Sequence, residues 1–339
     1  MPFHDSTAPF RPGAPSTACT EEESLGMLCF GDAPQPHAPP QPTCVHVPMP
    51  VLAGDRSCEA WPGHGTASNG SRGALHYRHD AEWLFGVVTL SESDYDAATA
   101  PPLQQAADAA YRQIFALQDA LGYPCIHRCW NYMADINGVS HGLERYRQFN
   151  VGRQQAFLAC ERQVAGQLPA ACALGHAEGP LTVAFLAGRT ASTALENPRQ
   201  LSAYRYPPQY GPRSPTFARA GLLQSGEHHL LLISGTASIV GHETLHRDDA
   251  EAQARESLAN IAAVVAAANR RLGREAFVIT RGHYRVYVRH AAQLPQIRQA
   301  LQAAGLPANA LYVAADICRA DLLLEIEATL TAASAGSLR

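Results

Sequence analysis

The stretch LYVAADICRADLLLEIEATL, residues 311–330, decides the fold of this chain. It predicts two apolar strands, at 311–315 and 322–328, joined by a short polar turn. The same stretch holds a thiol, Cys318, and a carboxyl group, Glu325. Burial among leucines would raise the pKa of that carboxyl group and make it a competent general acid. Strand alternation also allows a second interpretation, in which Glu325 and Glu327 both face solvent.

The composition indicates a globular protein with room for two domains. The chain has 339 residues, of which 46% are hydrophobic and 17% are charged. A net charge of -4 gives no electrostatic reason to expect nucleic acid or an anionic membrane as a partner. No apolar run reaches the ~20 residues of a membrane-spanning helix.

The N-terminus and the cysteines favour a cytoplasmic protein. The first residues, MPFHDSTAPFRPG, lack the basic and then apolar pattern of a signal peptide. The nine cysteines are scattered and odd in number, which predicts reduced thiols.

Residues 1–70 are rich in Pro, Gly, Ser and Thr, as in GDAPQPHAPPQPTC. Such a composition does not form a core by itself. We therefore expect an N-terminal extension, either disordered or wrapped around the body, with one strand near residues 44–52. Ordered structure is expected from about Ala74.

The rest of the chain repeats one predicted order of elements. The first segment has strands at 82–90, 125–133 and 181–186 and helices at 103–121 and 142–164. The second has strands at 217–223, 229–234, 276–280 and 284–288, a helix capped by Asp248 or Asp249 and closed by Gly273, a helix at 291–304, and the closing strand pair. A duplicated α+β unit follows, with domains at 71–200 and 201–339.

Two motifs contain metal-binding residue types. HETLH, residues 242–246, matches the H-E-x-x-H zinc signature, which needs both histidines on one face of a helix. The motif follows Gly241 in a predicted loop, before the helix begins. Cys125 and Cys129 share a strand face but supply only two of four ligands. We therefore predict no metal at the functional site.

Arginines and tyrosines are concentrated in two polar stretches, GLERYRQFNVGR at 142–153 and AYRYPPQYGPRSPTFAR at 203–219. Arginine binds carboxylates through two parallel hydrogen bonds, and tyrosine adds donors and flat apolar walls. Together with Glu325, these stretches suit a small polycarboxylate with an unsaturated ring. The alternative is that they are solvated helix-surface arginines and a domain linker.

These stretches also carry a family resemblance. The runs WNYMADIN and GLERYRQFNVGRQQAF, the segment YPPQYGPRSPTFARA, and ISGTASIVG followed by a helix with Gln253 and Asn260 resemble the chorismatases over residues 75–330. The last third separately resembles the enamine deaminases of the YjgF/RidA type, whose closing E-I-E strand is matched by LEIEA. The resemblance implies an α+β fold of two YjgF/RidA-like units, each a mixed sheet packed by helices.

The resemblance also implies an activity. Chorismatases cleave the enolpyruvyl ether of chorismate to pyruvate and a ring product, without a metal or organic cofactor. Glu325 would be the acid that protonates the enolpyruvyl methylene group. Chorismate, as the small-molecule partner, has two carboxylates, and a monomer or small homo-oligomer is expected. The implied substrate-binding residues are Arg153, Arg205, Tyr210, Arg213 and Ala237.

The ring product depends on the class of chorismatase. In members that form hydroxybenzoates, a cysteine stands seven residues before the catalytic glutamate, which is the spacing of Cys318 and Glu325. The resemblance therefore favours 3-hydroxybenzoate, 4-hydroxybenzoate or both, although Ala237 stands where the classes differ. Two alternatives remain at this point. One is a RidA-like enamine or imine deaminase that uses an arginine such as Arg319, and the other is a protein that binds small metabolites without turnover.

Overall fold

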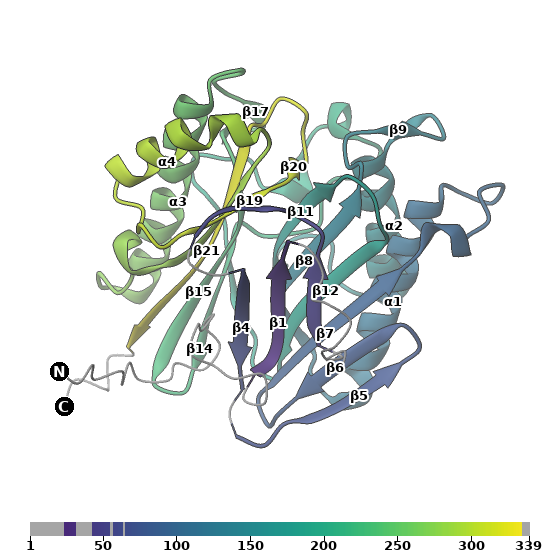
Figure 1. The fold of residues 1–339 in the computed structure, drawn as a ribbon. Helices are drawn as coiled ribbons and strands as arrows, with labels where there is room; N and C mark the ends of the chain where they lie inside the picture. The colour runs from purple at the N-terminus through teal and green to yellow at the C-terminus, as the bar shows by residue number, and fades with distance from the viewer. Residues whose placement is uncertain (1–23, 32–42, 55–56, 64, 334–339) are drawn as a thin grey trace, which may run out of the picture.

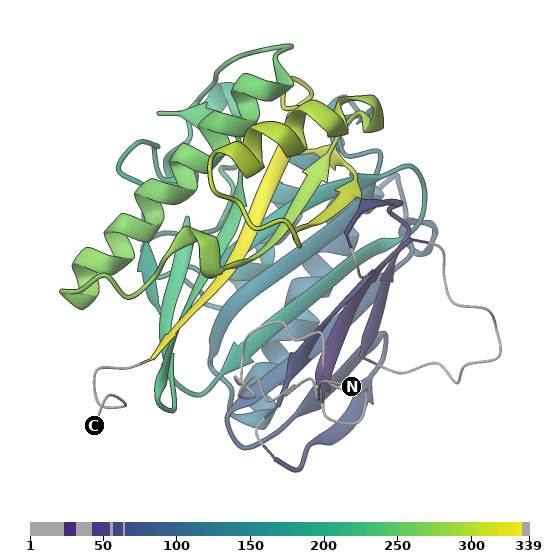
Figure 2. The same ribbon diagram turned by 60° about the vertical axis from the view of Figure 1, so that its left-hand side comes forward.

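Two mixed β-sheets form the centre of this protein. The computed structural model describes residues 24–31, 43–54, 57–63 and 65–333. Within these ranges, two seven-stranded sheets face each other, and each is covered on its outer side by two long helices (Figure 1). The turned view in Figure 2 shows the two helix pairs on opposite outer sides of the molecule. The expected α+β fold of two units, each a mixed sheet packed by helices, is confirmed.

The first sheet has the strand order β20-β11-β8-β12-β7-β6-β5. Its outer face packs on α1 (Pro102–Leu121) and α2 (Arg145–Ala159). Helix α1 begins with a proline at its first position and ends at Gly122, whose φ of 72° is a conformation that glycine adopts without strain. The strands are β5 (Ser68–Arg72), β6 (Leu75–His79), β7 (Trp83–Leu90), β8 (Cys125–Ala134), β11 (Ala170–His176), β12 (Leu181–Gly188) and β20 (Asp316–Ile317).

The second sheet has the strand order β13-β14-β15-β21-β18-β19-β3. Its outer face packs on α3 (Ala250–Leu272) and α4 (Leu294–Ala303). Asp249 caps α3 by accepting a hydrogen bond from the Ala252 N–H at 2.9 Å, and Gly273 ends the helix, as predicted. The strands are β3 (Val51–Ala53), β13 (Thr193–Leu195), β14 (Ala220–Ser225), β15 (His228–Thr236), β18 (His283–Val288), β19 (Leu311–Ala314) and β21 (Leu324–Ala333).

A third, smaller sheet lies at one opening between the two large sheets (Figure 1). It consists of β1 (Ser24–Phe30), β2 (Cys44–Val47) and β4 (Cys58–Pro62). Its apolar side chains, among them Phe30 and Trp61, join the buried cluster between the large sheets. Two short hairpins complete the described strands: β9 (Val139–Ser140) with β10 (Leu143–Glu144), and β16 (Ile239–Val240) with β17 (Glu243–Thr244).

The structure corrects four expectations. Ordered strands begin at Ser24 rather than near Ala74, because the polar N-terminal stretch contains short apolar segments that pack on the main core. Strand β11 was not predicted, and its sequence, AACALGH, is poor in the branched side chains that mark strands. Residues 276–280 form no strand and lead into the short turn Ile279–Arg281. Cys29 and Cys58 form a disulfide, so not all the cysteines are reduced thiols.

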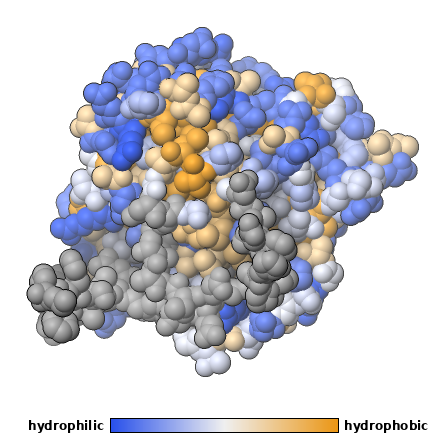
Figure 3. Space-filling model, viewed as in Figure 1, coloured by the Kyte–Doolittle hydropathy of each residue, from blue (hydrophilic) through white to orange (hydrophobic). Residues whose placement is uncertain are grey.

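The chain exchanges strands between its two large sheets. Strand β3, from the N-terminal region, is the last strand of the second sheet, and β20, from near the C-terminus, is the last strand of the first. The predicted domain boundary near residue 200 remains a prediction. Strand β13 lies before that position in the chain, yet it pairs with β14, which lies after it. On the face shown in Figure 3, apolar side chains gather over β19. None of the described helices is long and apolar enough to cross a membrane.

Candidate active site

Strand β21 places two carboxyl groups in the interior between the large sheets. Its apolar residues Leu324, Ile326 and Ala328 pack toward α3 and α4. The alternate residues Glu325 and Glu327 therefore point to the opposite face, and each is only 4% exposed. The interpretation that both carboxyl groups face solvent is wrong, because both sides of this strand are covered.

Glu325 holds its proton at neutral pH. Burial, with a smaller contribution from the neighbouring Glu327, raises the pKa of its carboxyl group to about 8, while Arg219 and Arg128 act in the opposite direction. One of its oxygens, Oε1, is buried and has no hydrogen-bond partner among the described residues. A neutral, desolvated carboxyl group of this kind is a suitable proton donor.

Glu327, two residues along the same strand, carries a negative charge. Burial alone would raise its pKa, but Arg285 and Arg128 outweigh that effect and lower it. Arg128 Nη2 lies 2.9 Å from Glu327 Oε2, and Arg285 Nη1 lies 2.5 Å from Oε1. Arg285 also pairs with Glu59 of β4, so the small N-terminal sheet contributes to this buried ion-pair network.

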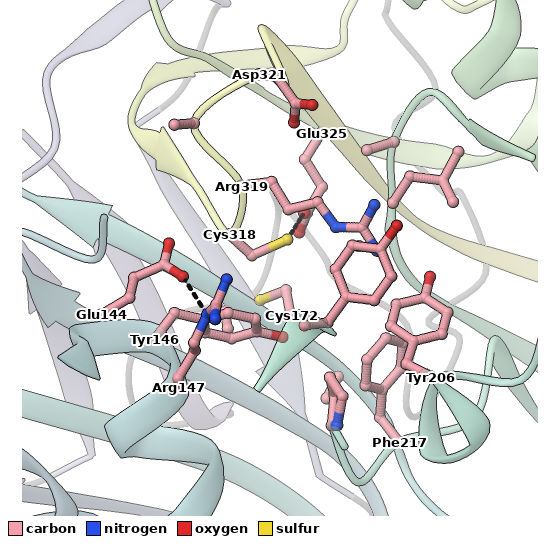
Figure 4. A pocket seen from close by; sticks show the side chains of 18 of the residues that line it. Glu144, Tyr146, Arg147, Cys172, Tyr206, Phe217, Cys318, Arg319, Asp321 and Glu325 are labelled. Atoms are coloured by element: carbon pink, nitrogen blue, oxygen red, sulfur yellow. Dashed lines mark hydrogen bonds and ion pairs between the residues drawn. The ribbon is translucent and has the colours of Figure 1, made fainter. Parts of the chain in front are cut away.

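A cavity of about 410 Å³ opens beside Glu325, within the range of ~300–1,000 Å³ that is usual for small-molecule sites. Figure 4 shows Glu325 and Cys318 on one side of it and Tyr206 and Phe217 on another. The lining residues come from the start of α2, from β11, from the 206–219 segment, from the end of β15 and from the β20–β21 connection. They are Glu144, Tyr146, Arg147, Arg153, Ala171, Cys172, Ala173, Tyr206, Tyr210, Pro215, Phe217, Arg219, Gly235, Ala237, Ile239, Cys318, Arg319, Ala320, Asp321 and Glu325.

The cavity leaves no room for a side chain at position 235. A β-carbon built on Gly235 would lie 1.8 Å from Glu325 Oε1 and 3.2 Å from the Cys172 β-carbon. The glycine at the end of β15 therefore lets the carboxyl group lie against the backbone of the neighbouring strand. Any other residue here would displace the proposed acid.

Cys318 lies next to the carboxyl group. Its Sγ is 4.0 Å from Glu325 Oε2 and is placed as a hydrogen-bond donor to it (Figure 4). Burial, with a smaller contribution from Glu325, raises the pKa of the Cys318 thiol to about 12. The thiol is therefore neutral, and it contributes a small, mostly apolar wall and a weak donor to the site.

The guanidinium group of Arg319 packs against two tyrosine rings of the cavity wall. Its guanidinium carbon lies 4.0 Å from the centre of the Tyr210 ring and 5.1 Å from that of Tyr206. Its Nη1 donates to the His242 carbonyl at 2.8 Å. Its Nη2 is buried and has no hydrogen-bond partner among the described residues, which is unusual for a buried donor.

Two further buried arginines line the cavity with unused donors. Arg219 Nη2 donates to the Leu201 carbonyl at 2.7 Å and to the Tyr206 hydroxyl at 2.8 Å, whereas Nε is unsatisfied within the described residues. Arg153 Nη2 donates to Asn150 Oδ1 at 2.9 Å, and its Nε is likewise unsatisfied there. The protein thus holds both guanidinium groups in place, and each has one N–H without a hydrogen-bond partner among the described residues.

The charge of the cavity favours an anion with more than one carboxylate. Four of the described lining residues are arginines, and three carry carboxyl groups. With Glu325 protonated, two carboxylates face four cations, which leaves two positive charges for a ligand. Arg147 is in part neutralised by Glu144, whose Oε2 lies 2.8 Å from Arg147 Nε (Figure 4).

The structure places five of the seven predicted site residues together. Arg153, Tyr210, Ala237, Cys318 and Glu325 all line the cavity.

Arg205 and Arg213 are exposed and lie outside that lining, so the structure does not bring them together with the other five, and their role in binding stays a prediction. The 203–219 segment turns twice, at Ala203–Arg205 and at Pro208–Tyr210, and this puts Arg205 on the surface beside Tyr204. Arg219 of the same segment lies inside instead.

The predicted binding residues did not include Arg219, Tyr146 or Cys172, although Arg219 and Tyr146 stand in the two stretches rich in arginine and tyrosine. Arg319 was named only for the deaminase alternative. Arg219 stands directly before β14, and the Tyr/Arg density of its segment was the available signal. Cys172 lies on the unpredicted strand β11 and carried no signal of its own. The HETLH motif lies around β17 and not on a helix, and His242 instead lies 3.1 Å from the Tyr210 hydroxyl through Nδ1.

Comparisons with known proteins agree on one family. Residues 59–187 match the family model described as chorismatase FkbO/Hyg5-like, N-terminal. The chain is similar to a 3-hydroxybenzoate synthase of Streptomyces hygroscopicus, with 37% identity over 300 residues and 84% of each chain covered. It is also similar to a chorismatase of Streptomyces rapamycinicus, with 40% identity over 282 residues, covering 79% of this chain and 80% of that one.

A solved structure extends the agreement to the fold. The crystal structure of a chorismatase superimposes with a TM-score of 0.81 at 34% sequence identity, covering 95% of this chain and all of the other. This protein belongs to the chorismatase family.

Proposed function

We propose that this protein cleaves the enolpyruvyl ether of chorismate to pyruvate and a hydroxybenzoate, with Glu325 as the general acid. The single observation that carries the proposal is a carboxyl group held neutral by burial beside a cavity lined by arginines. The named relatives, a 3-hydroxybenzoate synthase and a chorismatase, support it.

The chemistry begins with a proton transfer to carbon. An enol ether is cleaved when its methylene carbon is protonated, because the neighbouring ether oxygen then stabilises the cation as an oxocarbenium ion. Glu325 gives its proton to that carbon and becomes a carboxylate beside the new cation. The resulting ion pair is favourable in a site with little water. Capture of the cation by an oxygen nucleophile, water or a hydroxyl of the substrate, then leads to release of pyruvate.

The arginines fit the two carboxylates of chorismate. Arg153, Arg219 and Arg319 are buried or half-buried lining residues, and each keeps one unsatisfied N–H donor. Arginine hydrogen bonds to a carboxylate are charge-assisted and fix the orientation of a ligand. Tyr206 and Tyr210, whose ring centres lie 5.3 Å apart, offer aromatic surface and are already held against Arg319. We assign these five residues to substrate binding.

The ring product follows from how the remaining ring is treated. A hydroxybenzoate and pyruvate together have the atoms of chorismate, so aromatisation consumes no net water, whereas a cyclohexadiene diol requires one added water. Aromatisation therefore benefits from an apolar wall beside the acid. Cys318, Ala237 and Cys172 provide such a wall. We propose 3-hydroxybenzoate, 4-hydroxybenzoate or both as the ring product.

The decisive experiment is incubation of the purified protein with chorismate, with pyruvate measured enzymatically and the ring products separated by chromatography. Pyruvate and a hydroxybenzoate in equal amounts are expected. The Glu325→Gln variant serves as the matched control. Pyruvate together with a diol would overturn the product assignment alone. No pyruvate from the folded wild-type protein would overturn the activity, and would favour a protein that only binds a small metabolite.

A further inference from the structure

Three cysteines and a histidine meet on the small N-terminal sheet. In the register of its strands, Cys29 of β1 lies opposite His46 of β2 and opposite Cys58 of β4. Cys44 is two residues before His46 and so projects from the same face. The other face of this sheet carries the apolar residues that pack into the core, such as Leu28 and Val45.

The donor atoms of this cluster are close enough to share one ion. One ligand atom each from Cys29, Cys44 and His46 lies within 4.8 Å of the other two. Cys29 Sγ is 3.6 Å from Cys44 Sγ, and Cys44 Sγ is 3.4 Å from His46 Nε2. Cys58 Sγ is joined to Cys29 Sγ in the disulfide. It is not among the atoms that lie within 4.8 Å of one another, so it can complete the set only after reduction opens that bond.

We propose that the reduced protein binds one Zn²⁺ through Cys29, Cys44, His46 and Cys58. A set of three thiolates and one imidazole is a usual tetrahedral structural zinc site. The burial of the ligands is graded, since Cys29 is buried, Cys44 is partly exposed and His46 is exposed. The exposed histidine side gives a metal ion a path to the buried thiols, which a workable site requires.

The disulfide and the zinc site are alternative states of the same residues. A dithiol reductant supplies two electrons and two protons to the Cys29–Cys58 bond and is itself oxidised to a disulfide. Zinc then displaces the thiol protons of the three cysteines as it binds. In the reverse direction, an oxidant that takes two electrons from Cys29 and Cys58 closes the disulfide and releases the ion. The cluster is thus a metal site that exists only under reducing conditions.

This site is separate from the proposed active site. None of its four residues lines the cavity beside Glu325. It lies on the strand that supplies Glu59 to Arg285, because Glu59 follows Cys58 directly in β4. Zinc would therefore hold together the sheet that completes the buried ion-pair network, and its expected effect is on stability.

The test uses the full-length protein, reduced with a metal-free phosphine under anaerobic conditions and titrated with Zn²⁺ alone. We expect one zinc per chain by elemental analysis, and a rise in the midpoint of thermal unfolding on binding. Co²⁺ in place of Zn²⁺ should give the visible bands of a tetrahedral site and a thiolate charge-transfer band. The protein kept in its disulfide form should show neither signal.

The matched variants are Cys44→Ser in the cluster and Cys160→Ser outside it. Loss of a direct ligand should weaken Zn²⁺ binding at least ~100-fold, since even loss of an outer partner costs about 10–100-fold. Cys160→Ser should bind like the wild type. The proposal is overturned if the reduced wild type binds no zinc at micromolar concentration, or if Cys44→Ser binds it as tightly. Should Cys44→Ser fail to fold, His46→Ala replaces it under the same criteria.

Discussion

Replacement of Glu325 by glutamine should abolish turnover. It should also remove the loss of unfolding free energy that accompanies ionisation of this buried carboxyl group at high pH. The substitution keeps the shape of the protonated carboxyl group but cannot donate its proton to carbon. The described groups nearest in kind on the cavity wall are poor substitutes, because burial raises the pKa of the Cys318 thiol to about 12 and raises those of Cys172 and Tyr146 as well. Loss of an essential general acid costs on the order of 10²–10⁴ in rate.

The raised pKa sets the size of the effect and its pH dependence. With the ordinary value of 4.5, about 0.3% of the carboxyl groups would be protonated at pH 7, whereas a pKa of about 8 leaves about nine tenths protonated. Burial thus increases the donor population roughly 300-fold. Turnover should be constant below pH 7 and fall about tenfold per unit well above pH 8. The assay is kcat/KM for pyruvate release from pH 5.5 to 9.5, and the substrate carboxylates stay ionised throughout.

The same raised pKa predicts that Glu325→Gln, although inactive, is more stable than the wild type at alkaline pH. The folded-state pKa of Glu325 lies above the unfolded one, so its contribution to stability is complete below about pH 4.5 and is lost as pH rises toward 8. The unfolding free energy of Glu325→Gln minus that of the wild type should rise by about 3 kcal/mol from pH 5 to pH 8, because only the wild type loses stability over this range. Urea unfolding at both pH values measures it. A variant with more than a tenth of wild-type activity, or with the same pH dependence of stability as wild type, would refute the reasoning.

Three further predictions test the walls of the site. Cys318→Ala should still release pyruvate while the aromatic share of its products falls in favour of a diol, and an unchanged product ratio at equal conversion would leave Cys318 a packing role only. Arg219→Ala should lower kcat/KM roughly 10–150-fold, because a charge-assisted contact with a substrate carboxylate is lost. Arg205 is exposed, so Arg205→Ala should leave kcat/KM unchanged. Equal effects of the two substitutions would contradict the placement of the cavity. Glu327→Gln should move the alkaline limb of the pH profile to lower pH, because it removes the negative charge that helps to raise the pKa of Glu325, and an unmoved limb in the folded variant would count against that coupling.

Much of the fold could be predicted because its signals are local. The ends of α1 and α3 are marked by Gly122, Asp249 and Gly273, residues that fix a helix end through their own backbone or side chain. Strand β21 could be located from its apolar alternation. Strand β11 could not, because its small residues pack between other strands and have no pattern that differs from a buried helix.

The choice among the arginines could not be made from the sequence. Arg213 and Arg219 stand six residues apart in one segment rich in tyrosine and arginine, and they are of the same residue type. Which of them reaches the cavity depends on two turns in that segment and on the bridge that joins it to β11, where the Ala218 N–H donates to the Pro169 carbonyl at 2.9 Å. That contact involves a strand that local patterns do not reveal. The acid itself could be predicted, since its position within a leucine-rich strand is a local property.

The two glutamates of β21 show how one strand can hold a neutral acid and a fixed charge. Both are equally buried and two residues apart, so desolvation alone would protonate both. Arg128 and Arg285 reach Glu327 and keep it ionised, while neither ion-pairs with Glu325 among the described contacts. The charge kept on Glu327 then adds to burial in holding the proton on Glu325. The buried ion pairs therefore act on the chemistry as well as on the packing of the sheets, and Glu59 extends this dependence to the N-terminal sheet.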